Sequence, residues 1–149
     1  MNSSSIDIRG FTLIELLLVI AITSVIGATA IPAGSGFLVR NYHANSTNEV
    51  VSSLRTAQLR AMSGKGNSRW GVKITAFHII VFQGDSYSVR TPAFDETYTI
   101  PSSIGITPQE VVFAKGTGNP GATASISITS NVGNIRTVFV NEVGTVNVQ

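Results

Sequence analysis

The chain has 149 residues, a net charge of +2 and no cysteine. Its length leaves room for one anchoring helix and one globular domain of about 100 residues, so a second hydrophobic core is excluded. The lack of cysteine excludes disulfide bonds, thiolate metal sites and a cysteine nucleophile, and the small net charge does not by itself indicate a nucleic-acid partner.

A largely polar segment, residues 1–10, precedes an apolar run over residues 11–31 in which Glu15 is the one charged side chain. As a helix this run would be roughly 31 Å long at about 1.5 Å per residue, which matches a hydrocarbon core of roughly 30 Å. The sequence therefore predicts a transmembrane helix over residues 11–31. Because an ionised carboxylate in lipid is costly unless it is paired, Glu15 is expected to meet a positively charged partner.

The segment from Gly10 to Glu15, Gly-Phe-Thr-Leu-Ile-Glu, together with the apolar run resembles the class III signal of type IV pilins and type II secretion pseudopilins. The resemblance implies that residues 1–10 are a leader peptide, that a prepilin peptidase cuts between Gly10 and Phe11 on the cytoplasmic side, and that Phe11 is then N-methylated. It further implies that Glu15 meets the amino terminus of a neighbouring subunit when the helix docks into a filament.

A secretory signal peptide is a second interpretation of the same segment. Residues 13–26 would be its apolar region and residues 28–30, Ala-Thr-Ala, its cleavage site, releasing a soluble secreted domain that starts at Ile31. Two features count against it: Glu15 lies inside the apolar region, and Arg9 is the one basic residue before it. The mass of the mature amino terminus distinguishes the two interpretations.

Pro32 follows the apolar run directly and is predicted to kink the helix, because proline lacks an amide donor and clashes with the carbonyl four residues earlier. The resemblance implies that the helix continues beyond it. Residues 32–64 are predicted to form an amphipathic continuation, which Gly64 and Gly66 then end.

One face of this continuation is expected to pack on a sheet, since its residues recur at helical spacing. These residues are Val50, Val51, Leu54, Ala57, Gln58, Ala61 and Met62. The opposite face is expected to meet solvent through Asn48, Ser52, Ser53, Arg55 and Arg60.

Residues 65–149 are predicted to form a β-rich globular domain, because the hydrophobic pattern changes to a period of two and turn residues recur. The predicted strands are 70–74, 77–82, 86–89, 98–100, 111–113, 124–128, 136–140 and 145–148. A tight turn at Gly84-Asp85 is predicted to join the second and third strands, and the last two are predicted to form a hairpin. The fold class is α+β, with a long N-terminal helix packed on antiparallel sheets, pilin-like.

Residues 116–121 match the pattern Gly-x-Gly-x-x-Gly, but a dinucleotide site needs a helix to follow, and Pro120 and a strand pattern follow instead. We therefore interpret them as a loop. His43 and His78 lack the spacing of metal ligands, and no Gly-x-Ser-x-Gly elbow is present. We expect no cofactor, no metal site and no enzymatic activity.

A more specific resemblance involves residues 54–61, the following Trp-Gly-Val at 70–72 and the closing strands, which are similar to the GspH/FimT-like minor pseudopilins and pilins. The resemblance implies a DNA role as one alternative, since FimT-like minor pilins can bind DNA during uptake. A basic set therefore has two interpretations, a favourable cluster at the negative end of the helix dipole or a DNA-binding patch. The set consists of Arg55, Arg60, Lys65, Arg69 and Lys73.

The resemblance as a whole implies a structural subunit that inserts into the cytoplasmic (inner) membrane in a single pass, with its C-terminal domain outside. It is then built, with other pilin or pseudopilin subunits, into a type IV pilus at the cell surface or a type II secretion pseudopilus in the periplasm. The alternatives are a DNA-binding minor pilin and a secreted β domain. The sequence does not distinguish a pilus from a secretion system, or a major from a minor subunit.

Overall fold

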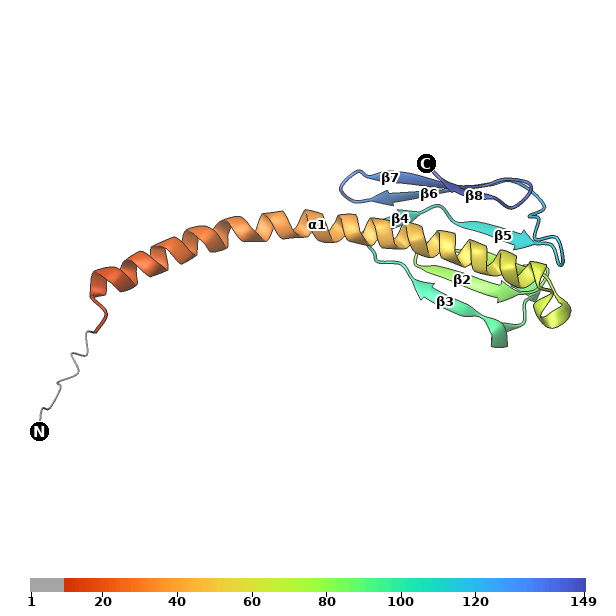
Figure 1. Cartoon of the computed structure of the whole chain (residues 1–149), viewed down its shortest axis with the longest axis horizontal. Coiled ribbons are helices and arrows are strands. Elements are labelled where there is room, and N and C mark those ends of the chain that lie inside the picture. The colour runs from red at the N-terminus through yellow and green to blue at the C-terminus, as the bar shows by residue number, and fades with distance from the viewer. Residues whose placement is uncertain (1–9) are drawn as a thin grey trace, which may run out of the picture. The chain divides into compact units, whose positions relative to one another are not determined.

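The structure is a computed structural model that describes the backbone of residues 10–149 and all of their side chains except those of 29–37. Of the predicted leader, residues 1–9 therefore lie outside the described part. The chain forms a long helix, α1 (Leu13–Met62), and two four-stranded antiparallel sheets (Figure 1). The α+β class is confirmed. The chain divides into two compact units, residues 1–37 and residues 38–149.

Helix α1 is assigned without interruption through Pro32, so the helix continues beyond the proline as expected, while a kink there stays a prediction. It ends at Met62, two residues before Gly64. Gly64 adopts a left-handed conformation with a φ of 66°, and its N–H donates to the carbonyl of Ala61 at 3.1 Å. A glycine is suited to this position because it has no Cβ to clash in that conformation.

The first sheet has the strand order β3-β2-β1-β5, and the second has the order β4-β6-β7-β8. The strands of the first sheet are β1 (Trp70–Ile74), β2 (His78–Gln83), β3 (Glu96–Thr99) and β5 (Gln109–Phe113). Those of the second are β4 (Ile104–Ile106), β6 (Ala124–Ser130), β7 (Ile135–Val140) and β8 (Val146–Val148). The predicted closing hairpin corresponds to β7 and β8, which pair antiparallel.

The core lies between the second half of α1 and one face of each sheet. Along β6 every second side chain is buried, as a period of two requires, whereas in β1 all residues except Lys73 are buried. Helix residues spaced three or four apart meet them from the other side. The central contributors are Val50, Leu54, Ala57 and Ala61 of α1, Trp70, Val72 and Ile74 of β1, and Ile126, Ile128, Val138 and Val140 of the second sheet.

The predicted strand over residues 86–89 is wrong. Tyr87–Val89 forms a short 3-10 helix and Pro92–Phe94 forms another, and the strand that pairs with β2 is β3, which begins at Glu96. The ring of Tyr87 packs edge-on against Phe82 with centroids 5.7 Å apart, so the chain after Gly84 folds over the face of the first sheet instead of continuing along its edge. Gly84-Asp85 is therefore not a two-residue hairpin turn.

Strand β4 was not predicted, because three residues with one apolar alternation, Ile104-Gly105-Ile106, give too short a signal beside the turn residues that precede them. The segment forms a strand because it pairs with β6, which lies far away in the sequence. Ile104 and Ile106 lie opposite Ser130 and Ile128 and are buried.

The faces of the second half of α1 differ from the prediction at Met62 and Ser53, and Arg60, expected to meet solvent, has a side chain only 18% exposed. Met62 is 49% exposed, and Ser53, expected to meet solvent, is only 2% exposed. The buried arc is wider than the apolar stripe because it also includes the polar side chains of His43, Thr47 and Ser53, of which His43 and Thr47 form hydrogen bonds. His43 Nε2 donates to the carbonyl of Ile128 in β6 at 3.0 Å, and Thr47 Oγ1 donates to the carbonyl of His43 at 2.8 Å.

Candidate functional site

The predicted cleavage point lies in non-helical, exposed backbone before α1. Gly10 has no atom within 4 Å of where a Cβ would stand, and the side chain of Phe11 is 85% exposed. Regular helix starts only at Leu13. The Gly10–Phe11 peptide bond is therefore not protected by helical hydrogen bonding or by packing within the described part of the chain.

Thr12 caps the start of α1. The backbone N–H of Glu15 donates to Thr12 Oγ1 at 3.3 Å, and the N–H of Leu16 donates to the carbonyl of Thr12 at 3.2 Å. Sequence reasoning missed this role, although Thr12 and Glu15 have the spacing of a capping box. The cap satisfies donors that would otherwise lack partners at a helix start.

Glu15 lies in the first turn of α1, where the helix dipole favours a negative charge by about 0.3 to 1 kcal/mol. Among the residues that the structure describes, none forms an ion pair with its carboxylate. The helix dipole thus offsets part of the unfavourable free energy of placing this charge in an apolar environment. A cationic partner for the carboxylate has to come from outside the described residues.

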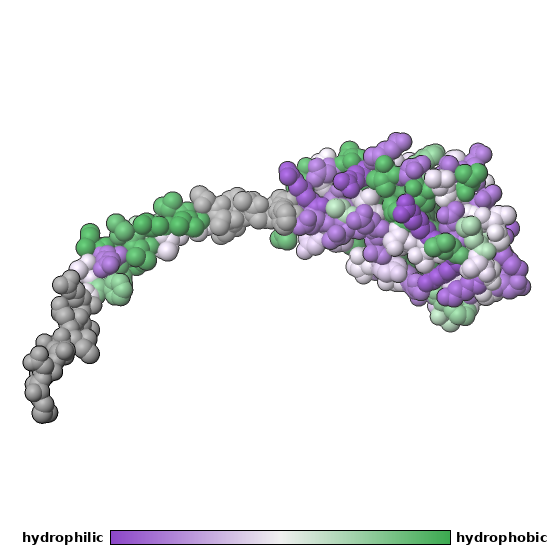
Figure 2. All heavy atoms as spheres, in the orientation of Figure 1, coloured by the Kyte–Doolittle hydropathy of each residue, from purple (hydrophilic) through white to green (hydrophobic). Residues whose placement is uncertain are grey.

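The first half of α1 exposes many apolar side chains, and Figure 2 shows a green stretch on the visible face near the start of the helix. Large apolar side chains more than half exposed are Phe11, Leu13, Ile14, Leu16, Leu17, Leu18, Val19, Ile20, Ile22, Val25 and Ile26. A helix that is apolar all round is typical of a segment buried by something other than its own chain. Within the described residues, no helix has the length and apolarity required to cross a membrane.

The few polar side chains of this half are satisfied within the helix. Thr23 Oγ1 donates to the carbonyl of Val19 at 2.8 Å, and Ser24 Oγ donates to the carbonyl of Ile20 at 2.7 Å. Because these hydroxyls bond back to the helix, they do not need water. Apart from Glu15, the transfer of the polar side chains described in this half of α1 to an apolar environment would therefore cost little free energy.

The basic set does not form a free cationic surface. Arg60 Nη2 donates to both carboxylate oxygens of Glu96, at 2.7 and 2.9 Å, and its guanidinium lies 4.9 Å from the centroid of the Trp70 ring. The ammonium of Lys65 lies 5.6 Å from the same centroid. Burial, followed by the nearby charge of Glu96, raises the pKa of Tyr98 above its ordinary value.

The remaining members of the basic set are partly paired as well. Arg69 Nε lies 3.5 Å from Asp85, and Lys73 Nζ donates to Glu110 Oε2 at 3.2 Å, while Arg55 is exposed. Cations neutralised by carboxylates contribute less to binding a phosphate backbone. DNA binding through this set stays a prediction, and salt-dependent binding of the whole chain tests it.

The segment that covers the first sheet is held by a polar network. Arg90 lies 3.8 Å over the centroid of the Tyr87 ring and donates from Nε to Asp95 Oδ2 at 2.7 Å, a hydrogen bond that raises the pKa of Arg90. The N–H of Tyr87 donates to Glu110 Oε1 at 2.9 Å. This network explains the local structure without a ligand.

The loop over residues 116–121 packs on the end of α1. The N–H of Gly116 donates to the carbonyl of Ala61 at 2.9 Å, which satisfies one of the carbonyls left over at a helix C-terminus. Gly118 has a φ of 69°, and a Cβ there would collide with the side chain of Met62. The glycines thus serve close packing on the helix, and strand β6 follows them, as the loop interpretation expects.

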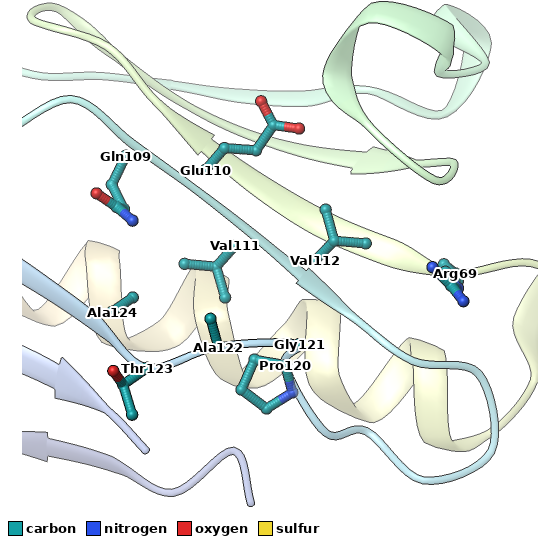
Figure 3. Close-up of a pocket in the computed structure, with 10 residues that line it drawn as sticks. All are labelled: Arg69, Gln109, Glu110, Val111, Val112, Pro120, Gly121, Ala122, Thr123 and Ala124. Carbon is teal, nitrogen blue, oxygen red and sulfur yellow. The ribbon is translucent and has the colours of Figure 1, made fainter. Parts of the chain in front are cut away.

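A hollow of about 280 Å3 lies where β5 separates from the segment that leads into β6 (Figure 3). Val111 and Ala124 line its floor, and Glu110 and Arg69 are its charged side chains. Both charges already have partners in the chain, since Glu110 accepts from Lys73 and Arg69 lies beside Asp85. The hollow therefore presents no uncompensated charge to a ligand.

Comparison with known protein families matches residues 7–31 to the prokaryotic N-terminal methylation motif, the signature of type IV pilins and pseudopilins. The resemblance that begins at Gly10 is thereby confirmed, and the matched range includes Phe11 and Glu15. The motif is shared by pilins and pseudopilins, so it does not separate the GspH/FimT-like group from the others. No curated protein and no solved structure matches the chain.

Proposed function

We propose that the protein is a structural subunit of a type IV pilus or a type II secretion pseudopilus. A prepilin peptidase removes residues 1–10, Phe11 becomes the N-methylated amino terminus, and residues 11–31 hold the subunit in the cytoplasmic membrane before assembly. The β-rich domain then lies outside the membrane. The methylation motif over residues 7–31 is the observation that carries this proposal.

Two structural features support it. The cleavage point lies in exposed, non-helical backbone, and the apolar side chains of the first half of α1 have no cover within the described part of the chain. Lipid can cover them before assembly, and the equivalent helices of neighbouring subunits can cover them afterwards. Both environments lack water, so polar side chains there need partners within the helix, as Thr23 and Ser24 have.

The GspH/FimT-like minor group is the part of the family that we propose for this chain. Its support is the resemblance of residues 54–61, 70–72 and the closing strands, together with two antiparallel sheets packed on one helix. The genes beside the one that encodes this chain would distinguish a pilus from a secretion system.

The mature amino terminus tests the proposal directly. Protein purified from membranes of cells that contain a prepilin peptidase should begin at N-methylated Phe11, and protein from cells lacking the peptidase should keep the leader. Mass spectrometry of the first tryptic peptide measures both. A mature chain that begins at Ile31 would instead support cleavage by a signal peptidase.

Substitution of Gly10 by valine should abolish processing, because a branched side chain obstructs access to the peptide bond. The folded chain itself has space for the change, since nothing lies within 4 Å of a Cβ at Gly10. Gly27→Val is a matched control, as its Cβ is equally unobstructed. Immunoblots should show leader-bearing protein for Gly10→Val only; mature protein of normal size from that variant contradicts the cleavage assignment.

A further inference from the structure

A second hollow, of about 320 Å3, lies beside α1 at one end of the second sheet. It is bounded by the helix on one side and by the turn before β7 on the other. Its lining residues are Arg40, His43, Ala44, Asn134, Ile135 and Arg136. None of them is acidic, so this hollow differs in charge from the one in Figure 3.

The strand places Arg136 at the rim of the core. Arg136 lies opposite Ile128 in the register of β6 and β7, and it shares a face with Val138 and Val140, both fully buried. Successive side chains on one face of a strand are two residues apart. Arg136 is therefore the position at which an apolar row under the helix becomes cationic.

The buried face of α1 also changes from apolar to cationic toward this hollow. Arg40, His43, Thr47 and Val50 follow one another at spacings of three or four residues, which places them on one side of α1. Val50 and Thr47 are buried, His43 is held by its hydrogen bond to the carbonyl of Ile128, and Arg40 is exposed. Two rows thus bring two arginines to one hollow.

These two arginines have no carboxylate partner among the described residues, whereas Arg60, Arg69, Lys73 and Arg90 each pair with an acid. Like charges held close together repel, and the repulsion is relieved when an anion binds between them. Arginine presents a planar set of donors that matches the oxygens of a phosphate. The hollow therefore has the chemistry of a phosphate site.

This cationic hollow also has an exposed apolar side chain in its lining. Ile135 lines it and is 66% exposed. Val132 and Leu38 do not line it but lie two residues from lining residues in the sequence, and they are 52% and 53% exposed. A ligand with a phosphate group and an adjoining apolar part would contact both kinds of side chain. Cations and exposed apolar side chains together are typical of surfaces that bind anionic lipids.

We propose that Arg40 and Arg136 bind the phosphate group of an anionic phospholipid headgroup. The inference rests on the proposed function in one respect, because a membrane-anchored subunit is the form of the protein that meets such lipids. Arg40 lies nine residues beyond Ile31, the last residue of the proposed anchor. The site would bind lipid while the subunit is in the membrane, before it enters a filament.

The test uses the full chain in detergent micelles, with either phosphatidylglycerol or phosphatidylcholine added, and counts retained lipid by native mass spectrometry. Phosphatidylglycerol should be retained in preference, and the preference should fall roughly fivefold for Arg40→Gln or Arg136→Gln and about thirtyfold for the double variant. Arg55→Gln is the matched control, an exposed arginine of the same helix without an ion pair in the described residues. It should leave the preference unchanged.

A separate arm adds inorganic phosphate alone and follows thermal unfolding by circular dichroism, which also verifies that each variant is folded. Phosphate that protects the wild-type chain and displaces phosphatidylglycerol supports the site. Protection by phosphate without any preference for phosphatidylglycerol overturns the lipid assignment, and an unchanged preference in the folded double variant overturns the site itself. Processing at Gly10 is measured independently, so failure of the site is distinguishable from failure of the proposed function.

Discussion

The two halves of α1 have opposite relations to the rest of the chain. In the first half, the large apolar side chains from Leu13 to Ile26 are more than half exposed, whereas in the second half Val50, Leu54, Ala57 and Ala61 are fully buried. Every side chain of the first half that the structure describes is exposed. The second half has one face under two sheets.

This contrast shows that exposure in α1 follows from the presence of a partner rather than from residue type. Burial of apolar surface contributes about 25 cal/mol per Å2 wherever a partner exists. The sheets supply that partner for the second half, and they also bury polar Ser53, Thr47 and His43. The first half requires a partner from outside the chain, for which we propose lipid and then neighbouring subunits.

Truncation of the chain should have the largest effect on its stability and solubility. A chain that starts at Asn41 loses only the exposed half and should remain folded and soluble, because it keeps the helix face that covers the sheets. A chain that starts at Trp70 loses Val50, Leu54, Ala57 and Ala61 and should aggregate. Size-exclusion chromatography and thermal melts compare the two; an equally stable monomer from the shorter chain would show that the helix is not part of the core.

Glu15→Leu should separate membrane insertion from assembly. The variant removes a costly charge from the apolar segment and should insert at least as well as wild type, yet enter filaments poorly. The neighbour's ammonium would then be buried without a partner, a loss on the order of 3 to 5 kcal/mol. The fraction of processed protein in membranes and the fraction in sheared filaments are measured side by side.

Thr12→Ala is the control for Glu15, because it removes the helix cap and leaves the carboxylate in place. The lost cap should cost about 0.5 to 2 kcal/mol of helix stability without blocking assembly. Normal incorporation of Glu15→Leu would mean that the carboxylate merely reaches the headgroups. If both variants entered filaments equally poorly, Glu15 would act by stabilising the start of the helix and not by pairing with a neighbour.

Leu54→Ala and Leu17→Ala apply one change to the two halves of the helix. Leu54 is fully buried, so its truncation should destabilise the globular unit by about 2 to 5 kcal/mol. Leu17 is 54% exposed and should leave that stability unchanged. Urea unfolding of the full chain in detergent, followed by Trp70 fluorescence, gives both values, and a similar loss for the two variants would refute the contrast.

Ser53→Ala should have the smallest effect and the opposite sign. The Ser53 hydroxyl is buried and has no hydrogen-bond partner among the described residues, so its removal should stabilise the chain by up to about 1 kcal/mol. Ser52→Ala, next to it on the exposed side, should change stability by less than about 0.5 kcal/mol. A loss of stability for Ser53→Ala would indicate that the hydroxyl has a partner, such as water.

The sequence by itself determined the features that depend on neighbouring residues. The motif from Gly10 to Glu15, the apolar run after it and the α+β class could be predicted because cleavage signals and hydrophobic periods are local properties. The hairpin of β7 and β8 could be predicted for the same reason, since its turn and its alternation are adjacent in the chain. The structure has a helix from Leu13 onward and the paired strands β7 and β8 at the end of the chain.

Tertiary structure decided the features that depend on residues far apart. Ser53 and His43 are buried because two sheets cover a wider arc of α1 than its apolar stripe, and no helical period reports how wide that cover is. The strand expected at residues 86–89 became a 3-10 turn because the Tyr87 ring packs on Phe82. Two members of the basic set are neutralised by acids that lie far away in the sequence. The pairing of β1 with β5 places Glu110 opposite Lys73, and Glu96 of β3 forms its ion pair with Arg60 of α1.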